Sequence, residues 1–259
     1  MVGSECISNH PILNVSGGVG YVTDIAGVNT YVTGSRLAIL AIVFISDIYG
    51  FKPPLLRKVA DKVAQHGYFV AVPDFFHGEP YNDGNVSRPF DPWFKDHDSA
   101  KGIETAKPII EALKRKGASA VGVAGFCWGA LKRKGASAVG AAGFCWGART
   151  LTDLGKAKLV QASVILHPSF LTVDDIRGVE VPIAILGAEH DTISPPKLIN
   201  QFQQVLNAKP EIDSYVKIFP NVSHGWTVRY DPNDPKAVEA AGEAHQTMIN
   251  WFDKHLKKN

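Results

Sequence analysis

The pentapeptide Gly143-Phe144-Cys145-Trp146-Gly147 constrains the fold more than any other stretch of the sequence. An apolar run, residues 138–142, leads into it, and a helix-forming stretch, residues 148–154, leads out. This order of strand, turn and helix is typical of a nucleophile elbow, G-x-Nu-x-G, with cysteine in the nucleophile position. The glycines permit a turn too tight for side chains, and a helix N-terminus favours a thiolate. The alternative, a buried structural cysteine in a Gly-rich turn, remains open at this point.

The elbow belongs to a segment that occurs twice in tandem. Residues 113–130 read LKRKGASAVGVAGFCWGA and residues 131–148 read LKRKGASAVGAAGFCWGA, so Val123 against Ala141 is the one difference. Two copies do not make a repeat architecture, and a sheet has one central position for this strand. We expect the copy with Cys145 to fill it, because a longer amphipathic stretch and another strand follow that copy closely. The surplus segment around residues 118–131, which carries Cys127, should lie outside the core, since spare chain in a loop costs little closure entropy.

Length and composition indicate one α/β domain over residues 1–259. The chain is long enough for a sizeable core, and 45% apolar and 20% charged residues are ordinary values for a globular protein. The formal charge of +2 comes from the duplication, because one copy adds three basic residues and no acid. We therefore expect no nucleic-acid partner.

The three cysteines show neither a C-x-x-C pair nor a Cys/His ligand spacing, so we expect no metal site and no disulfide framework. The longest apolar run, Leu37–Ile45, is too short to cross a bilayer, and the first residues lack the pattern of a signal peptide. These features predict a cytoplasmic protein in a reducing setting, without a membrane partner.

Strands and helices alternate along the rest of the chain. We expect edge strands within residues 18–33 and buried strands over 37–45, 68–72, 138–142, 162–166, 181–186 and 215–219. Helices are expected over 53–67, 104–116, 148–154, 195–206 and 235–255, and an aromatic-rich functional loop over 73–97. The alternation predicts a doubly wound, mostly parallel sheet, whose chemistry gathers beyond the carboxyl ends of its strands.

Two residues downstream lie where that rule places chemistry. Asp191 follows the strand over 181–186, and His224 follows the strand over 215–219. The chain order of nucleophile, acid and histidine is that of α/β-hydrolases. In such a triad His224 would take the thiol proton of Cys145, and Asp191 would fix the tautomer of His224.

Other residues could take these roles. His167 ends a strand, but it precedes the acid in the chain, and His190 adjoins Asp191 too closely to be oriented by it. Glu189 could replace Asp191, although its position is poorer. We therefore prefer Asp191 with His224.

Five motifs together resemble the dienelactone hydrolase family, also called carboxymethylenebutenolidases. They are Asp47-Ile48-Tyr49-Gly50, Pro73-Asp74-Phe75, the elbow, Gly187-x-x-x-Asp191 and Ser223-His224-Gly225. The chain looks most like the plant branch, whose members are often labelled endo-1,3;1,4-β-glucanase. The resemblance implies an α/β-hydrolase fold, no cofactor, and a catalytic triad of Cys145, Asp191 and His224. It also implies an oxyanion hole made by the backbone N–H groups of Ile48 and Trp146.

The resemblance further implies roles for residues around the triad. Bacterial members carry a glutamate that activates the thiol where this chain has the shorter Asp47. Arg229 corresponds loosely to the family's substrate-carboxylate arginine, and Trp226 is a second candidate for substrate binding. Arg88 in the aromatic loop is a weaker candidate, because a solvated arginine there needs no further role.

Three functions follow from these features. The first is a cysteine-dependent hydrolase of small esters or lactones that works through an acyl-enzyme, as a monomer or weak homodimer. The second is a glycan hydrolase, as the plant label suggests, which would need two carboxylates across the sugar, drawn from Asp47, Asp74 and Asp191. The third is an inactive thiol-bearing binding or redox protein.

Overall fold

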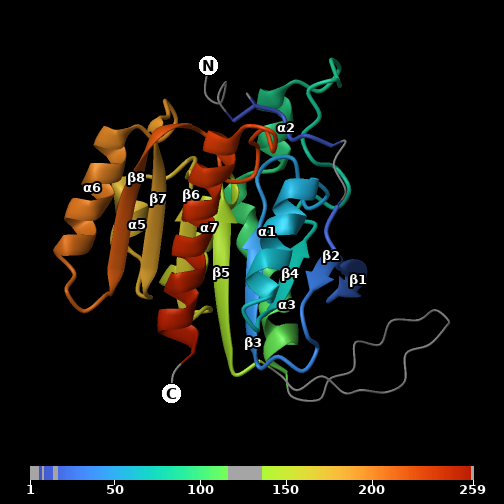
Figure 1. Cartoon of the computed structure of the whole chain (residues 1–259), viewed down its shortest axis with the longest axis horizontal. Coiled ribbons are helices and arrows are strands. Elements are labelled where there is room, and N and C mark those ends of the chain that lie inside the picture. Colours follow the sequence, from blue (N-terminus) through green and yellow to red (C-terminus); the bar gives the residue numbers. More distant parts are fainter. Residues whose placement is uncertain (1–5, 8, 14–16, 116–135, 258–259) are drawn as a thin grey trace.

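A computed structural model of the chain describes residues 6–7, 9–13, 17–115 and 136–257 (Figure 1). Eight strands form one sheet in the order β1-β2-β4-β3-β5-β6-β7-β8. The strands are β1 (Tyr21–Ile25), β2 (Val28–Thr33), β3 (Leu40–Ile45), β4 (Phe69–Pro73), β5 (Ala138–Phe144), β6 (Ala162–Leu166), β7 (Ile183–His190) and β8 (Ser214–Ser223). From β4 to β8 every neighbouring pair is parallel, whereas β2 pairs antiparallel with both β1 and β4.

Helices cover both faces of the sheet, as an α/β-hydrolase fold requires (Figure 1). Helices α1 (Pro54–Ala64) and α7 (Pro235–Leu256) pack on one face. The other face carries α3 (Gly102–Lys114), α4 (Gly147–Lys156), α5 (Val173–Arg177) and α6 (Pro196–Asn207). A short helix α2 (Phe90–Asp96) and a 3₁₀ turn η1 (Ser99–Lys101) lie before α3. Within the described ranges, no helix has the length and apolar content to cross a membrane.

The predicted core strands form because their side chains are apolar on both sides. All but the first residue of β3 are buried, and β5, β6 and the first six residues of β7 are almost fully buried. A parallel strand with helices above and below must be apolar throughout, in contrast to a strand with one wet face. The prediction of a doubly wound, mostly parallel sheet is confirmed.

The copy of the duplicated segment that contains Cys145 forms β5, between β3 and β6, as predicted. The surplus segment around residues 118–131, with Cys127, lies outside the described residues. The predicted loop over 73–97 was wrong in part, because α2 forms within it where Phe90 and Trp93 bury one side of a helical turn. Helix α5 was missed, since five residues are too few to show a helical period.

Candidate active site

The elbow places Cys145 directly after β5 in a backbone conformation that side chains rarely adopt, with φ of +49°. A Cβ atom on Gly147 would lie 2.3 Å from the Ile45 carbonyl oxygen, and one on Gly143 would lie 2.6 Å from the Gly147 carbonyl oxygen. Both positions therefore exclude any side chain. Left-handed backbone at a non-glycine residue costs of order 1–3 kcal/mol and is typical of functional turns. The predicted strand–turn–helix geometry is present around Cys145.

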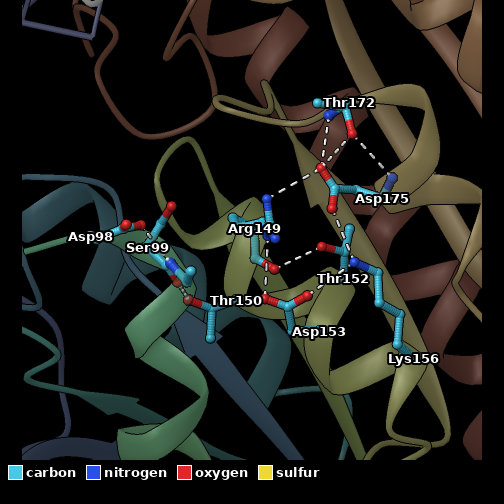
Figure 2. A network of polar contacts seen from close by, with 10 residues as sticks. Asp98, Ser99, Arg149, Thr150, Thr152, Asp153, Lys156, Thr172 and Asp175 are labelled. Carbon is cyan, nitrogen blue, oxygen red and sulfur yellow. Dashed lines mark hydrogen bonds and ion pairs between the residues drawn. The ribbon is translucent and has the colours of Figure 1, made fainter.

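Polar contacts fix helix α4 on both sides, and with it the turn that carries the cysteine (Figure 2). On one side the Thr150 hydroxyl donates a 2.8 Å hydrogen bond to the Ser99 carbonyl. On the other side Arg149 and Lys156 contact the two carboxylate oxygens of Asp175 at 3.3 and 3.0 Å. Helix α4, which follows the elbow, is thereby held at both its first and its last turn.

The two other predicted triad members meet at the ends of β7 and β8. The His224 Nδ1 and the Asp191 Oδ2 lie 2.8 Å apart, and both side chains are buried. The Asp191 Oδ1 accepts hydrogen bonds from the backbone N–H groups of Ile193 and Ser194 at 2.9 and 3.0 Å. These bonds fix the carboxylate and hold the His224 ring in one orientation.

The charges of this pair are set by their environment. Burial opposes ionisation of Asp191, but the contact with His224 outweighs it and lowers the pKa of Asp191. Burial also opposes the protonated ring of His224, but the charges of Cys145 and Asp191 prevail and raise the pKa of His224 to about 9. At neutral pH the structure therefore favours a carboxylate beside an imidazolium.

A serine that the sequence analysis missed joins the cysteine to the histidine. The Ser169 Oγ lies 3.3 Å from the Cys145 Sγ and 3.3 Å from the His224 Nε2. Its loop follows β6, and the Ser169 N–H donates to the Cys145 carbonyl at 3.2 Å. His167 and Phe170 on either side of it adopt positive φ angles of +37° and +60°. The signal for Ser169 was its place after the carboxyl end of a predicted parallel strand.

A second thiol, also missed, covers the nucleophile. Cys6 is fully buried, with its Sγ 3.6 Å from the Cys145 Sγ and 3.3 Å from the Ser169 Oγ. The Cys6 Sγ, the Cys145 Sγ and a His224 ring nitrogen all lie within 4.8 Å of one another, close enough to act together as metal ligands. The sequence held no signal for this cluster, because Cys6 is 139 residues away from Cys145.

The two thiols differ in their ionisation. Burial opposes ionisation of Cys145, but hydrogen bonding from Cys6 and the charge of His224 hold the pKa of Cys145 well below its usual range. The contact with Cys145, together with burial, raises the pKa of Cys6 well above its usual range. The negative charge is therefore held on Cys145, at the N-terminus of α4, where the helix dipole also favours an anion.

Asp47 and Arg229 form a buried ion pair beside the thiols. The Arg229 Nε lies 3.4 Å from the Asp47 Oδ2, and the Arg229 Nη1 donates a 2.7 Å hydrogen bond to the Cys6 carbonyl. The Asp47 Oδ1 also accepts from the backbone N–H of Tyr49 at 3.0 Å. Burial raises the pKa of Asp47 to about 6, although the Arg229 guanidinium favours the carboxylate. The structure thus brings Asp47 and Arg229 to the wall of the site.

Trp226 lies elsewhere, although it follows the histidine closely in the chain. Its ring packs on His167 and Phe219, with centroid distances of 5.4 Å to each, in the core cluster between the sheet and α7. The Cys145 sulfur belongs to the cluster on the opposite face of the sheet. Trp226 therefore packs in the core on the α7 side of the sheet, below the turn that carries His224, rather than beside the Cys145 thiol.

The competing residues of the sequence analysis have other partners. The His167 Nε2 lies 2.8 Å from the Thr227 hydroxyl, and burial holds the pKa of His167 well below its usual range, so its ring is neutral. His190 is exposed next to Glu189. Arg88 pairs with two surface carboxylates, as a solvated arginine does.

Two backbone N–H groups are the predicted donors of the oxyanion hole. Trp146 follows Cys145 in the elbow, and Ile48 follows Asp47 after β3. Among the described residues, neither N–H donates to a backbone carbonyl in the turn and loop contacts around it. The Trp146 ring is fixed from the side, since its Nε1 donates a 2.8 Å hydrogen bond to the His97 carbonyl.

Comparison with known proteins adds an independent line of evidence. The chain matches the model of the Dienelactone hydrolase family over residues 28–132 and again over 130–256, so each match contains one copy of the duplicated segment. It is 36% identical over 215 residues to a Zea mays protein named Endo-1,3;1,4-beta-D-glucanase. That alignment covers 81% of this chain but only 64% of the maize protein.

Two further relatives match over nearly their whole length. The Carboxymethylenebutenolidase homolog of Mus musculus is 26% identical over 247 residues, which is 93% of each chain. The crystal structure of the Dienelactone hydrolase from Anabaena variabilis superposes with a TM-score of 0.63 at 16% identity. It covers 92% of this chain and 97% of the other, and it supports the fold alone.

Proposed function

Because this chain belongs to the dienelactone hydrolase family, we propose that it hydrolyses small carboxylic esters or lactones, with Cys145 as the nucleophile. Family membership makes the chain a hydrolase; the substrate class and the residue roles are the proposal. One observation carries it. The His224 Nδ1 and the Asp191 Oδ2 lie 2.8 Å apart, next to Cys145 at its strained turn, and the surroundings of Cys145 favour its thiolate form.

In the first step the Cys145 thiolate attacks the acyl carbonyl, and the carbonyl oxygen becomes an oxyanion. The backbone N–H groups of Ile48 and Trp146 would donate hydrogen bonds to it, each worth roughly 3 kcal/mol in comparable sites. The C–O bond then breaks, and the protonated His224 gives its proton to the leaving alkoxide. In a lactone that alkoxide stays attached to the acyl group.

In the second step His224, now neutral, takes a proton from water, and the resulting hydroxide attacks the thioester. The Cys145 thiolate leaves and the carboxylic acid is released. Asp191 stabilises the imidazolium in both steps without itself taking the proton. Arg229, buried beside the thiols, is the candidate residue to attract a substrate carboxylate.

The name of the maize relative raises glycan hydrolysis as a second candidate. That chemistry needs two carboxylates, one as acid and one as base or nucleophile. Asp191 is engaged by His224, and Asp74 accepts hydrogen bonds from the N–H groups of Phe76 and Gly78. Asp47 is paired with Arg229. All three carboxylates thus serve other contacts, which favours the thiol mechanism.

The test is to trap the acyl-enzyme. A panel of aryl esters and lactones is mixed with the protein, the intact mass is measured at short times, and the acylated residue is mapped. We expect the acyl group on Cys145 and a loss of roughly a thousandfold or more in turnover for Cys145→Ala.

Cys127→Ala is the matched control, because the same pentapeptide surrounds Cys127 in the other copy. Its turnover should equal that of the unmodified chain. Turnover lost in Cys127→Ala and kept in Cys145→Ala would assign catalysis to the first elbow. Hydrolysis of a mixed-linkage glucan without any aryl esterase activity would favour the glycan hydrolase instead, and acylation without turnover would favour a binding protein.

A further inference from the structure

The N-terminal segment brings a second thiol into contact with the nucleophile. Cys6 and Cys145 are free, both are fully buried, and their sulfurs lie 3.6 Å apart. A disulfide bond is about 2.05 Å long, so the sulfurs need to approach by roughly 1.5 Å to form one. The hydrolytic steps described above give Cys6 no part.

The segment that carries Cys6 is fixed by contacts with the wall of the site. The Arg229 guanidinium holds the Cys6 carbonyl at 2.7 Å. The Tyr49 hydroxyl donates to the Ile7 carbonyl at 3.1 Å and lies 3.0 Å from the His10 Nδ1. These contacts keep the Cys6 thiol over Cys145 rather than in solvent.

We propose that Cys6 and Cys145 are a redox modification site: a hydroperoxide converts them into a reversible disulfide that switches the hydrolase off. The inhibitory consequence rests on the proposed function, in which Cys145 is the nucleophile. Formation of the disulfide itself requires only the two thiols and the oxidant. A small peroxide such as hydrogen peroxide is the oxidant class that fits a site covered by its own chain.

The reaction has two balanced steps. The Cys145 thiolate attacks one peroxide oxygen, the O–O bond breaks, and the other oxygen leaves as water or an alcohol with a proton from His224. This leaves Cys145 as a sulfenic acid. The Cys6 sulfur then attacks the Cys145 sulfur, the S–O bond breaks, and water leaves with the Cys6 proton. Two thiols have lost two electrons, the peroxide has gained them, and a dithiol reductant reverses the change.

The surroundings assign the two roles. Cys145 lies at the N-terminus of α4 and near His224, both of which favour the thiolate that attacks peroxide. Cys6 comes from another part of the chain and touches the sulfur that would carry the sulfenic acid. The disulfide would consume the nucleophile, and it would also tie the N-terminal segment over the site.

The experiment uses the whole chain, reduced and then freed of reductant, with hydrogen peroxide as the probe. Trypsin without reduction gives three cysteine peptides of different mass, residues 1–36, 117–132 and 135–149, which contain Cys6, Cys127 and Cys145 respectively. We expect an intact mass lower by two hydrogens and a linked pair of peptides 1–36 and 135–149. Esterase activity should fall at least tenfold and return with dithiothreitol.

Cys6→Ser and Cys127→Ser are the paired variants, each compared with its own reduced form. Cys6→Ser should give no linked pair; its Cys145 should gain two or three oxygens, and dithiothreitol should not restore its activity. Cys127→Ser should behave like the unmodified chain. A disulfide to the Cys127 peptide would overturn the proposal. So would the addition of two or three oxygens to Cys145 in the unmodified chain, because Cys6 would then give no protection. If the disulfide forms but the reduced protein hydrolyses esters equally well after alkylation of Cys145, the proposed function fails and the redox site stands.

Discussion

The reactivity of Cys145 is decided by a few groups within contact of its sulfur. Ser169 and Cys6 touch it directly, His224 lies close behind, and Asp191 acts through the ring of His224. Burial alone would keep this thiol protonated and inert. The neighbouring charges and hydrogen bonds reverse that effect.

The pH dependence of hydrolysis should report both ionisations. Activity should rise with pH as Cys145 ionises, at a pH below the value of about 8.5 for a free thiol. It should fall again near pH 9, where His224 loses its proton. Because Asp191 helps to raise the pKa of His224, Asp191→Asn should move the alkaline limb to lower pH and reduce turnover by roughly tenfold or more. The measurement is kcat/KM against pH with an aryl ester, and an alkaline limb unchanged in Asp191→Asn would assign it to another group.

Asp47 should influence the thiol through its charge. Ionised Asp47 opposes the Cys145 thiolate and also offsets the charge of Arg229. Asp47→Asn should therefore shift the rise in the rate of iodoacetamide alkylation of Cys145 to lower pH. Asp47→Glu keeps the charge and should keep or improve activity on small lactones. An unchanged alkylation profile in Asp47→Asn would mean that this residue only accepts the turn hydrogen bond of Tyr49.

At the scale of the elements, the site depends on how α4 is held. Asp175 is the central group of that attachment, because it receives Arg149 and Lys156 from α4 and closes the capping box of α5 with Thr172 (Figure 2). Burial opposes ionisation of Asp175, but its hydrogen bonds from Thr172 and Lys156 outweigh burial and lower its pKa.

Asp175→Ala should lower the free energy of unfolding by about 2 kcal/mol, because it removes one half of the capping box of α5 and leaves two cations without their buried partner. A carboxyl group whose pKa is lowered in the folded protein stabilises it fully at pH values above its pKa in the unfolded chain, about 4. This stabilisation is lost as the pH falls below that value. The difference between Asp175→Ala and the unmodified chain in urea unfolding should therefore shrink in acid. Asp174→Ala, next to it on the exposed side of α5, is the control and should change stability by less than about 0.5 kcal/mol. Equal losses in both variants would contradict the assignment.

At the scale of the whole molecule, the duplication interrupts the connection from α3 to β5. The Ala136 N–H nevertheless donates a 2.8 Å hydrogen bond to the Leu113 carbonyl, so the ends of the interruption already meet. Between Leu113 and Ala136 lie 22 residues. Removing one 18-residue copy would leave four residues between the leucine and the alanine, in the sequence Leu-Lys-Arg-Lys-Gly-Ala. In this string the N–H of the alanine, the sixth residue, would donate to the carbonyl of the leucine, the first, and glycine would be fifth. This is the Schellman motif, which ends many helices.

Deletion of residues 113–130 should therefore leave the fold and the esterase activity intact. The shorter connection closes a smaller loop, so the free energy of unfolding should stay equal or rise by up to about 1.5 kcal/mol. Urea unfolding and turnover of the deletion variant provide the measurement. Loss of the fold or of activity would mean that the first copy contributes contacts that the second cannot replace.

The sequence by itself determined most of the elements and the identity of the proposed triad. Buried strands such as residues 162–166 are apolar throughout, and the proline and glycine at the ends of α1 punctuate a clear helical period. The order Cys145, Asp191, His224, each after a strand, placed three side chains at one edge of a parallel sheet, because parallel strands end together.

Only the tertiary structure decided what surrounds that triad. Cys6 reaches Cys145 across 139 positions of sequence, and Ser169 fills the space between thiol and ring. Trp226, adjacent to the histidine loop in sequence, faces the opposite core. No local pattern encodes such contacts, because they depend on how separate segments pack once the sheet has formed. Periodicity and turn chemistry act over a few residues, whereas the environment that ionises a buried thiol is assembled from the whole chain.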